Sequence, residues 1–213
     1  MSYVLPLAGL AFANFLGIIS PGPAFMMVSR AAAGHSKGAA VALGMGVAIA
    51  AAIWAAAACF GVSILMSRFA PVYGAIQLAG GAFLIWLGIG AWRSGNDKPQ
   101  DNEAADLVHA GQQRGIARSV LVGAMLSLGN PKIVIFFSSI FVALLPAHAP
   151  LWVRLAVIVI VGLQETLWYT VVAFIFSRPR VQAAYRRARN WIERTLGAVL
   201  IGIGVRIIAT VKI

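Results

Sequence analysis

The sequence Ser20-Pro21-Gly22-Pro23 interrupts the first long apolar run of the chain, and Asn130-Pro131-Lys132 interrupts the fourth. A proline inside a helix removes a backbone donor and clashes with the preceding turn. In hydrocarbon the freed carbonyl groups have no water to bind, so such breaks are tolerated only where protein or a wet cavity surrounds them. Two such interruptions, one in each half of the chain, indicate the binding site of a transporter.

The apolar runs around these breaks place the chain among membrane proteins. Hydrophobic residues make up 61% of the 213 residues and charged residues only 11%, with a mean hydropathy of +0.87. A membrane-spanning helix needs about 20 apolar residues. Six runs fit that requirement, at residues 3–28, 39–66, 73–92, 119–145, 152–176 and 191–209. We therefore predict an all-α polytopic membrane protein with six spans in one membrane domain, residues 1–213.

Lysine and arginine are distributed unevenly between the two faces of this predicted topology. One face has twelve of them, namely Arg30, Lys37, Arg93, Lys98, Arg114, Arg118, Arg178, Arg180, Arg186, Arg187, Arg189 and Arg194. The other face has four, namely Arg68, Arg154, Arg206 and Lys212. The positive-inside rule makes the first face cytoplasmic and puts both termini in the periplasm. This bias accounts for the formal net charge of +11 without a nucleic-acid partner.

A short internal repeat suggests how the spans are organised. The stretch GAFLIWLG at residues 81–88 recurs as GAVLIGIG at residues 197–204. Three spans per half would turn the second half upside down, which gives an inverted repeat of the kind found in secondary transporters. We assign repeat one to residues 1–95, a cytoplasmic linker to 96–115 and repeat two to 116–213. Chance similarity between two Gly- and Leu-rich segments is the alternative.

Both interruptions contain the residue types that are favoured at the start of a helix. Ser and Asn are favoured N-caps and Pro is favoured at the first helical position, so we expect half-helices to begin at Ser20-Pro21 and at Asn130-Pro131. A helix start exposes N–H groups and the positive end of the dipole, which together bind anions. Two such ends would hold a carboxylate, whereas structural kinks satisfied by neighbouring helices are the other interpretation. The predicted substrate-binding residues are Ser20, Pro21, Gly22, Pro23, Asn130, Pro131, Lys132, Gln164, Tyr169 and Asn14.

Two ionisable residues lie deep in the apolar runs, Lys132 and Glu165. A charge at the centre of a bilayer costs about 2.5–3.5 kcal/mol even on the lowest scale, so such residues are functional candidates. We predict that Glu165 couples transport to protons, and a structural ion pair with Lys132 is the alternative. The single cysteine, Cys59, and three histidines in predicted connections give no metal-ligand cluster. We therefore expect neither a metal site nor a cofactor.

Taken together, these motifs resemble the lysine exporter (LysE) superfamily, and within it the homoserine/threonine exporter branch. The matching residues are Ser20-Pro21-Gly22-Pro23, the glycines Gly34, Gly38 and Gly44, the stretch from Gly80 to Gly88, and Asn130-Pro131-Lys132. The resemblance implies a six-span protein of the bacterial inner membrane that exports amino acids, driven by the proton gradient, and that acts as a dimer. Members of the family often carry an acidic residue in the fifth span. Glu165 takes that place, where several members have Asp.

The residues favour three classes of function to different degrees. An amino-acid exporter fits two positive helix ends for the carboxylate and Glu165 for the ammonium. An ion or metal permease on the same scaffold is the alternative, although the spans lack clustered Cys, Met or His. An intramembrane enzyme is disfavoured, because the spans offer neither paired aspartates nor a histidine cluster. The expected partners are a small amino acid, protons and membrane lipids.

Overall fold

The computed structural model describes residues 3–19, 22–34, 36–68, 70–93, 115–146 and 149–210. The secondary structure of these ranges is α-helical, as the apolar runs predict. The helices are α1 (Val4–Ile19), α2 (Pro23–Gly34), α3 (Lys37–Arg68), α4 (Ala70–Arg93), α6 (Ile116–Leu128), α7 (Pro131–Leu144), α8 (Leu151–Ile175) and α9 (Pro179–Thr210). The predicted linker at 96–115 lies almost wholly outside the described residues.

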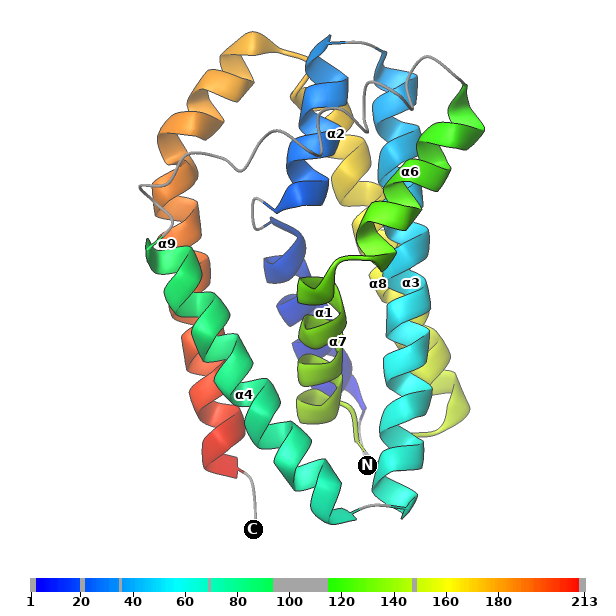
Figure 1. The fold of residues 1–213 in the computed structure, drawn as a ribbon, viewed down its shortest axis with the longest axis vertical. Coiled ribbons are helices and arrows are strands. Elements are labelled where there is room, and N and C mark those ends of the chain that lie inside the picture. The colour runs from blue at the N-terminus through cyan, green and yellow to red at the C-terminus, as the bar shows by residue number, and fades with distance from the viewer. Residues whose placement is uncertain are drawn as a thin grey trace.

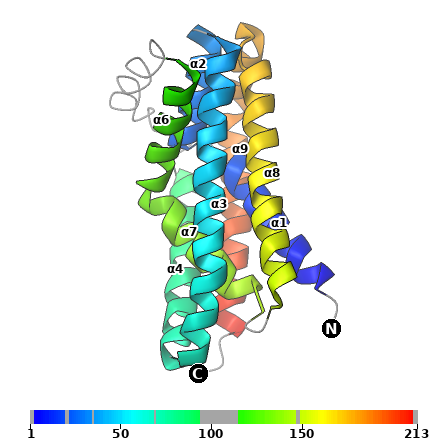
Figure 2. The same cartoon turned by 90° about the vertical axis from the view of Figure 1, so that its right-hand side faces the viewer.

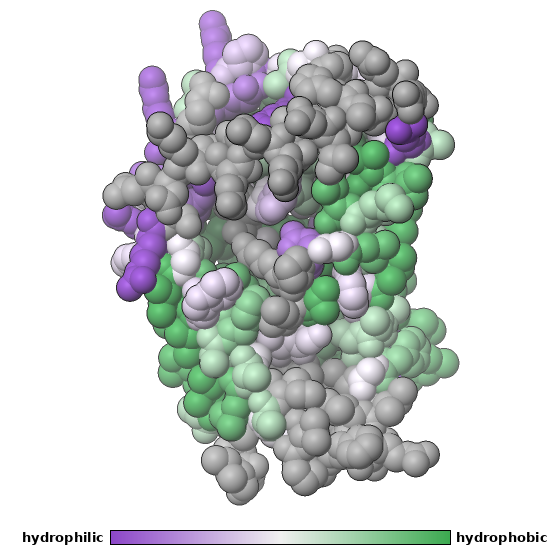
Figure 3. Space-filling view, in the orientation of Figure 1, coloured by the Kyte–Doolittle hydropathy of each residue, from purple (hydrophilic) through white to green (hydrophobic). Residues whose placement is uncertain are grey.

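The helices form an elongated bundle in which α3 and α8 run along its length (Figures 1 and 2). At one end α2 and α8 end while α3 and α9 begin, and we call this the arginine-rich end because Arg30, Arg178, Arg180, Arg187 and Arg189 lie there. Hydrophilic side chains gather at this end over the start of α9, and hydrophobic ones cover the sides below it (Figure 3). At the other end α1 begins and α9 ends (Figure 1).

Helix length and composition agree with a membrane protein. Among the described residues, α3 over Lys37–Gly61 and α8 over Leu151–Ile175 are each long and apolar enough to cross a bilayer. The pair α1 and α2, bent by 56° at the first break, adds a third span if it is counted as one unit. The remaining predicted runs correspond to α4, to α6 with α7, and to α9.

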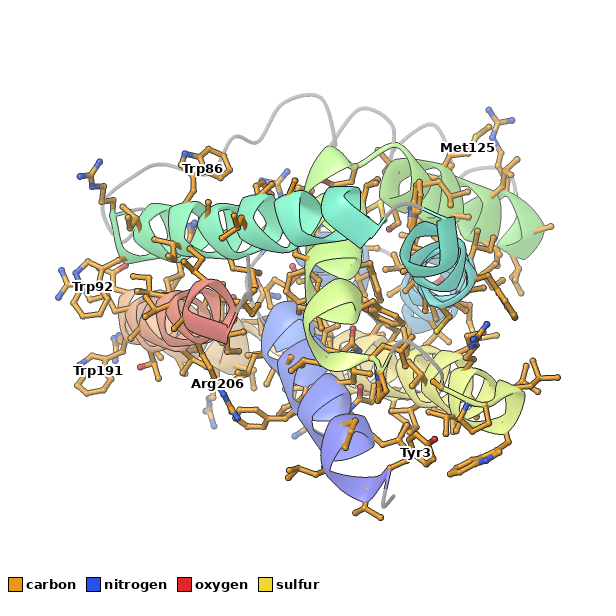
Figure 4. All side chains as sticks on the ribbon, turned by 90° about the horizontal axis from the view of Figure 1, so that it is seen from below. Tyr3, Trp86, Trp92, Met125, Trp191 and Arg206 are labelled. Atoms are coloured by element: carbon orange, nitrogen blue, oxygen red, sulfur yellow. The ribbon has the colours of Figure 1, made fainter. Side chains whose placement is uncertain are left out.

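The exposed surface of the bundle is apolar, as lipid contact requires. On α8 the side chains of Val159, Leu163 and Leu167 are exposed at a spacing of four residues, while Val161, Glu165 and Tyr169 are buried on the opposite stripe. In Figure 4 three tryptophans point outward, Trp86 and Trp92 from α4 and Trp191 from α9. Trp92 and Trp191 lie at the ends of the predicted runs 73–92 and 191–209, where exposed tryptophan is typical of a membrane interface.

Two clusters of buried side chains form the core. The larger contains Leu10, Phe137, Phe141, Val157 and Leu200 from α1, α7, α8 and α9. The second lies toward the arginine-rich end and contains Phe25, Val28, Leu43, Tyr169 and Val172 from α2, α3 and α8.

Helices α4 and α9 pack along each other through glycines. A Cβ on Gly88 would lie 2.6 Å from the Gly197 carbonyl oxygen, and a Cβ on Gly197 would lie 2.5 Å from that of Gly88. Gly81 and Gly204 face each other in the same way, with Cβ positions 3.0 and 2.6 Å from the opposite carbonyl oxygens. These four glycines are the ends of the repeated stretch. Because Gly81 is equivalent to Gly197 and Gly88 to Gly204, exchanging the two helices turns each contact into the other.

Two boundaries differ from the sequence prediction. Helix α2 begins at Pro23 rather than at Pro21, so the second proline of the motif takes the first helical position. Residues 177–190, which the predicted runs leave as a connection between the fifth and sixth spans, are helical from Pro179 and continuous with the last span. Ala, Arg and Gln, all strong helix formers, make up most of residues 180–190, and no Gly or Pro occurs between Pro179 and Gly197.

Candidate functional site

The two helix breaks lie beside each other although more than a hundred residues separate them in the chain. Pro23 and Ala24 at the start of α2, and Ser127 and Asn130 at the junction of α6 and α7, line one small cavity of about 30 Å³. The two interruptions are therefore parts of a single region.

The backbone of the second break ends one helix and starts the next. The Gly129 N–H donates to the Met125 carbonyl at 2.9 Å, which closes α6. The Asn130 carbonyl then accepts from the Ile133 N–H at 3.0 Å, the first turn of α7. Pro131 takes the first helical position, where its missing N–H costs nothing. The sequence prediction of this helix start is confirmed.

The first break also contains a helix start, but the helix begins at Pro23, the second proline of the motif, rather than at Pro21. The Gly22 carbonyl accepts from the Met26 N–H at 3.0 Å, so Gly22 directly precedes α2. The N–H groups of Ala24 and Phe25 belong to the first turn, which has no intrahelical acceptors for them. Ser20 and Pro21 lie outside the described residues, so their predicted roles stay predictions.

A larger cavity of about 90 Å³, which we call the central cavity, adjoins the two breaks. Its volume exceeds the roughly 10–15 Å³ that one water molecule needs and is far below the roughly 300–1,000 Å³ of pockets for drug-sized ligands. It suits a small solute. Six of the predicted site residues line it, namely Asn14, Gly22, Pro23, Asn130, Glu165 and Tyr169.

Two buried acceptors in the lining of the central cavity lack partners. Glu165 is 5% exposed, and its Oε2 has no hydrogen-bond partner among the described residues. Asn14 is 3% exposed, and its Oδ1 is likewise without a partner there. A buried acceptor without a donor carries a desolvation penalty. Both groups would be satisfied by a ligand that brings several N–H donors.

Gln164 does not line the central cavity, but it hydrogen-bonds Asn14, which does. Its Oε1 accepts from Asn14 Nδ2 at 3.0 Å, and its Nε2 donates to the Ala11 carbonyl at 3.0 Å. These bonds tie α8 to α1 and fix the orientation of the Asn14 amide. Gln164 is not among the residues that line the central cavity in this structure, and its predicted contact with substrate stays a prediction.

The side chains of Pro131 and Lys132 lie outside the described residues. The predicted ion pair between Lys132 and Glu165 therefore stays a prediction. A second buried acid was missed, Glu193 in α9, which is 4% exposed and accepts from Arg189 Nε at 2.7 Å. The i, i+4 spacing of Arg189 and Glu193 was the available signal for this pair.

An apolar wall completes the central cavity. Phe136, Phe137 and Leu200 belong to it, and none carried a sequence signal that separates it from lipid-facing residues. Gly17 makes room for the wall, because a Cβ there would lie 2.5 Å from Phe136 Cζ. Within the part of the chain that the structure describes, no group of three or more His, Cys, Asp or Glu is placed to hold a metal ion.

Comparison with known proteins gives consistent matches over nearly the full chain. A family profile described as LysE type translocator matches residues 15–210. A protein of Salmonella typhi named threonine efflux protein is 31% identical over 198 residues, covering 93% of this chain and 95% of its own length. The threonine efflux protein of Escherichia coli strain K12 is 28% identical with the same coverage. An uncharacterized membrane protein of Haemophilus influenzae is 28% identical over 92% of both chains. No solved structure matches the chain significantly.

Proposed function

Because the chain belongs to the LysE type translocator family, we propose that it exports a small amino acid across the bacterial inner membrane by proton antiport. Members of this family are transporters and not enzymes. L-Threonine is the first substrate to test, since two of the relatives are named threonine efflux proteins.

The polar groups that line the central cavity are the main support for this proposal. An amino acid presents an ammonium and a carboxylate a short distance apart. Glu165 Oε2 and Asn14 Oδ1 offer unpartnered acceptors for the ammonium. The starts of α2 and α7, at Pro23 and Asn130, offer helix dipoles and N–H groups for the carboxylate. The volume admits only a small substrate, which fits a threonine-sized molecule.

We propose that Glu165 exchanges a proton for the substrate ammonium. A carboxylate buried to this degree is too costly to leave charged and unpaired in the bilayer. Unless Lys132 pairs with it, either the ammonium or a proton accompanies it through the transport cycle. Alternation between the two would couple export of the amino acid to entry of a proton.

The proposed topology has six spans, an inverted repeat and both termini in the periplasm. The charge bias toward the arginine-rich end supports this orientation. The glycine contact between α4 and α9 supports the repeat, because the equivalent residues Gly81 and Gly197, and likewise Gly88 and Gly204, make equivalent contacts.

Transport by purified protein in liposomes tests the proposal. Labelled L-threonine should move against its gradient when a pH gradient is imposed, and Glu165→Gln should abolish the response to pH while the protein stays folded. Glu193→Gln is the matched control. Among the described residues Glu193 is also a buried acid, but it does not line the central cavity, so this variant should preserve the pH response. Normal pH-driven transport by Glu165→Gln would show that this residue does not couple protons.

A further inference from the structure

A second cavity, of about 490 Å³, opens at the arginine-rich end between α2, the end of α8 and the start of α9. We call it the outer cavity. Its lining includes Phe25, Ser29, Arg30, Gln182, Tyr185 and Arg189. It is several times larger than the central cavity, and no residue lines both.

The outer and central cavities are neighbours along one helix. Gly22, Pro23 and Ala24 line the central cavity, and the next residue of α2, Phe25, lines the outer one. Phe25 is 1% exposed and is the first residue of α2 that lines the outer cavity. Its ring packs at 5.0 Å from Phe176 and 4.8 Å from Tyr185, measured between centroids. Three aromatic rings thus pack together beside the point on α2 where the lining changes from the central to the outer cavity.

The polar groups of the outer cavity suit an amino acid. Two guanidinium groups, Arg30 and Arg189, line it, and none of the acidic residues that the structure describes does. Arg189 uses its Nε for Glu193. That contact engages one of the three guanidinium nitrogens, Nε. A guanidinium binds a carboxylate through paired hydrogen bonds.

Two further side chains complement this charge. Gln182 donates its Nε2 to the Phe176 carbonyl at 2.7 Å, which leaves Oε1 to accept from an ammonium. Burial raises the pKa of Tyr185, so its hydroxyl stays protonated and can donate. That hydroxyl has no partner among the described residues. Acceptor and donor groups therefore stand on the same helix as Arg189.

We propose that the outer cavity is a loading site, where the Arg189 guanidinium binds the carboxylate of the amino acid before the substrate passes Phe25 into the central cavity. This inference rests on the proposed export of amino acids and adds a second binding step on the arginine-rich side. On this proposal the buried Phe25 ring is displaced when the substrate moves from the outer to the central cavity.

The test compares Arg189→Gln with Arg187→Gln in liposomes that transport L-threonine. Arg187 is the matched control, because it is an exposed arginine of the same helix that does not line the outer cavity. We expect Arg189→Gln to raise the KM for threonine about tenfold to a hundredfold, as loss of a hydrogen-bonded charge pair does. Arg187→Gln should stay within about twofold of the wild type. Inhibition by L-threoninol, which lacks the carboxylate, should be equal in all three proteins.

A second variant serves as a control for loss of folding. Arg189→Gln leaves Glu193 buried without its partner, so Arg189→Gln with Glu193→Gln removes both charges together. The double variant should show the same rise in KM. An unchanged KM in either folded variant would overturn the loading site, as would an equal loss for threonine and threoninol.

An acidic lipid headgroup offers the same anionic chemistry as a carboxylate, so the assay is run in two membranes. A loading site predicts the same KM defect in phosphatidylglycerol and in phosphatidylcholine liposomes. A defect confined to phosphatidylglycerol would assign the arginine to lipid and refute the loading site. If wild-type protein transports none of the amino acids in either membrane, the proposed function is itself wrong and the loading site falls with it.

Discussion

Replacing Gly197 by alanine tests the packing of α4 against α9 at its closest point. The added methyl group would lie 2.5 Å from the Gly88 carbonyl oxygen, and ordinary contact begins at 3.4 Å. The obstacle is backbone, so the helices themselves must separate by about 1 Å locally. Overpacking of this kind costs about 1–3 kcal/mol, and the better helix propensity of alanine offsets about 0.5–1 kcal/mol.

The net expectation for Gly197→Ala is a loss of about 1–2 kcal/mol in the free energy of unfolding. For a chain of this size that corresponds to a fall in Tm of about 2–8 °C. Gly202 is the matched control, because it is an exposed glycine of the same helix and a Cβ there meets nothing within 4 Å. Gly202→Ala should raise Tm by about 1–4 °C through helix propensity alone.

Thermal denaturation of the detergent-purified variants, followed by tryptophan fluorescence, measures both shifts. Gly88→Ala should repeat the result of Gly197→Ala, since the two glycines oppose each other. If Gly197→Ala melts at or above the temperature of Gly202→Ala, close glycine packing does not hold α4 against α9.

Three further changes probe the site and the topology. Asn14→Leu should lower Tm by leaving the Gln164 amide oxygen unpaired, at a cost of about 1–3 kcal/mol; adding Gln164→Leu should recover stability but not threonine efflux, and recovered efflux would exclude Asn14 from the substrate site. Gly17→Ala should push the Phe136 ring into the central cavity and reduce the efflux rate severalfold with little change in Tm, whereas a normal rate would place substrate elsewhere. Reporter proteins fused at Asp101 and at the C-terminus should lie on opposite sides of the membrane, and a shared side would overturn the topology.

The helices could be predicted because apolar length is a direct physical requirement of a bilayer. The fifth run, predicted at 152–176, is α8 at Leu151–Ile175. The start of α9 was missed for a physical reason. Arginine marks loops in membrane sequences, but it is also a strong helix former, so charge alone does not separate a loop from a helix that leaves the membrane.

The polar part of the site could be predicted because proline, asparagine and glutamate are costly in hydrocarbon and therefore conspicuous. Its apolar part could not, since Phe136 or Leu200 in a cavity looks the same in sequence as a residue facing lipid. The roles of Gln164 and Glu165 differ because neighbours on a helix point about 100° apart, and only the packing of α8 decides which of them reaches the cavity.

The exchangeable glycine contact bears on the direction of transport. Two glycine contacts that are equivalent to each other give the molecule no means of distinguishing the two sides of the membrane. Vectorial movement must then come from whatever one half has and the other lacks. Helix α9 has 32 residues against 24 in α4, and its additional turns start at Pro179 and carry Gln182 and Tyr185. The direction of transport would thus depend on the additional turns of α9, which have no counterpart in α4.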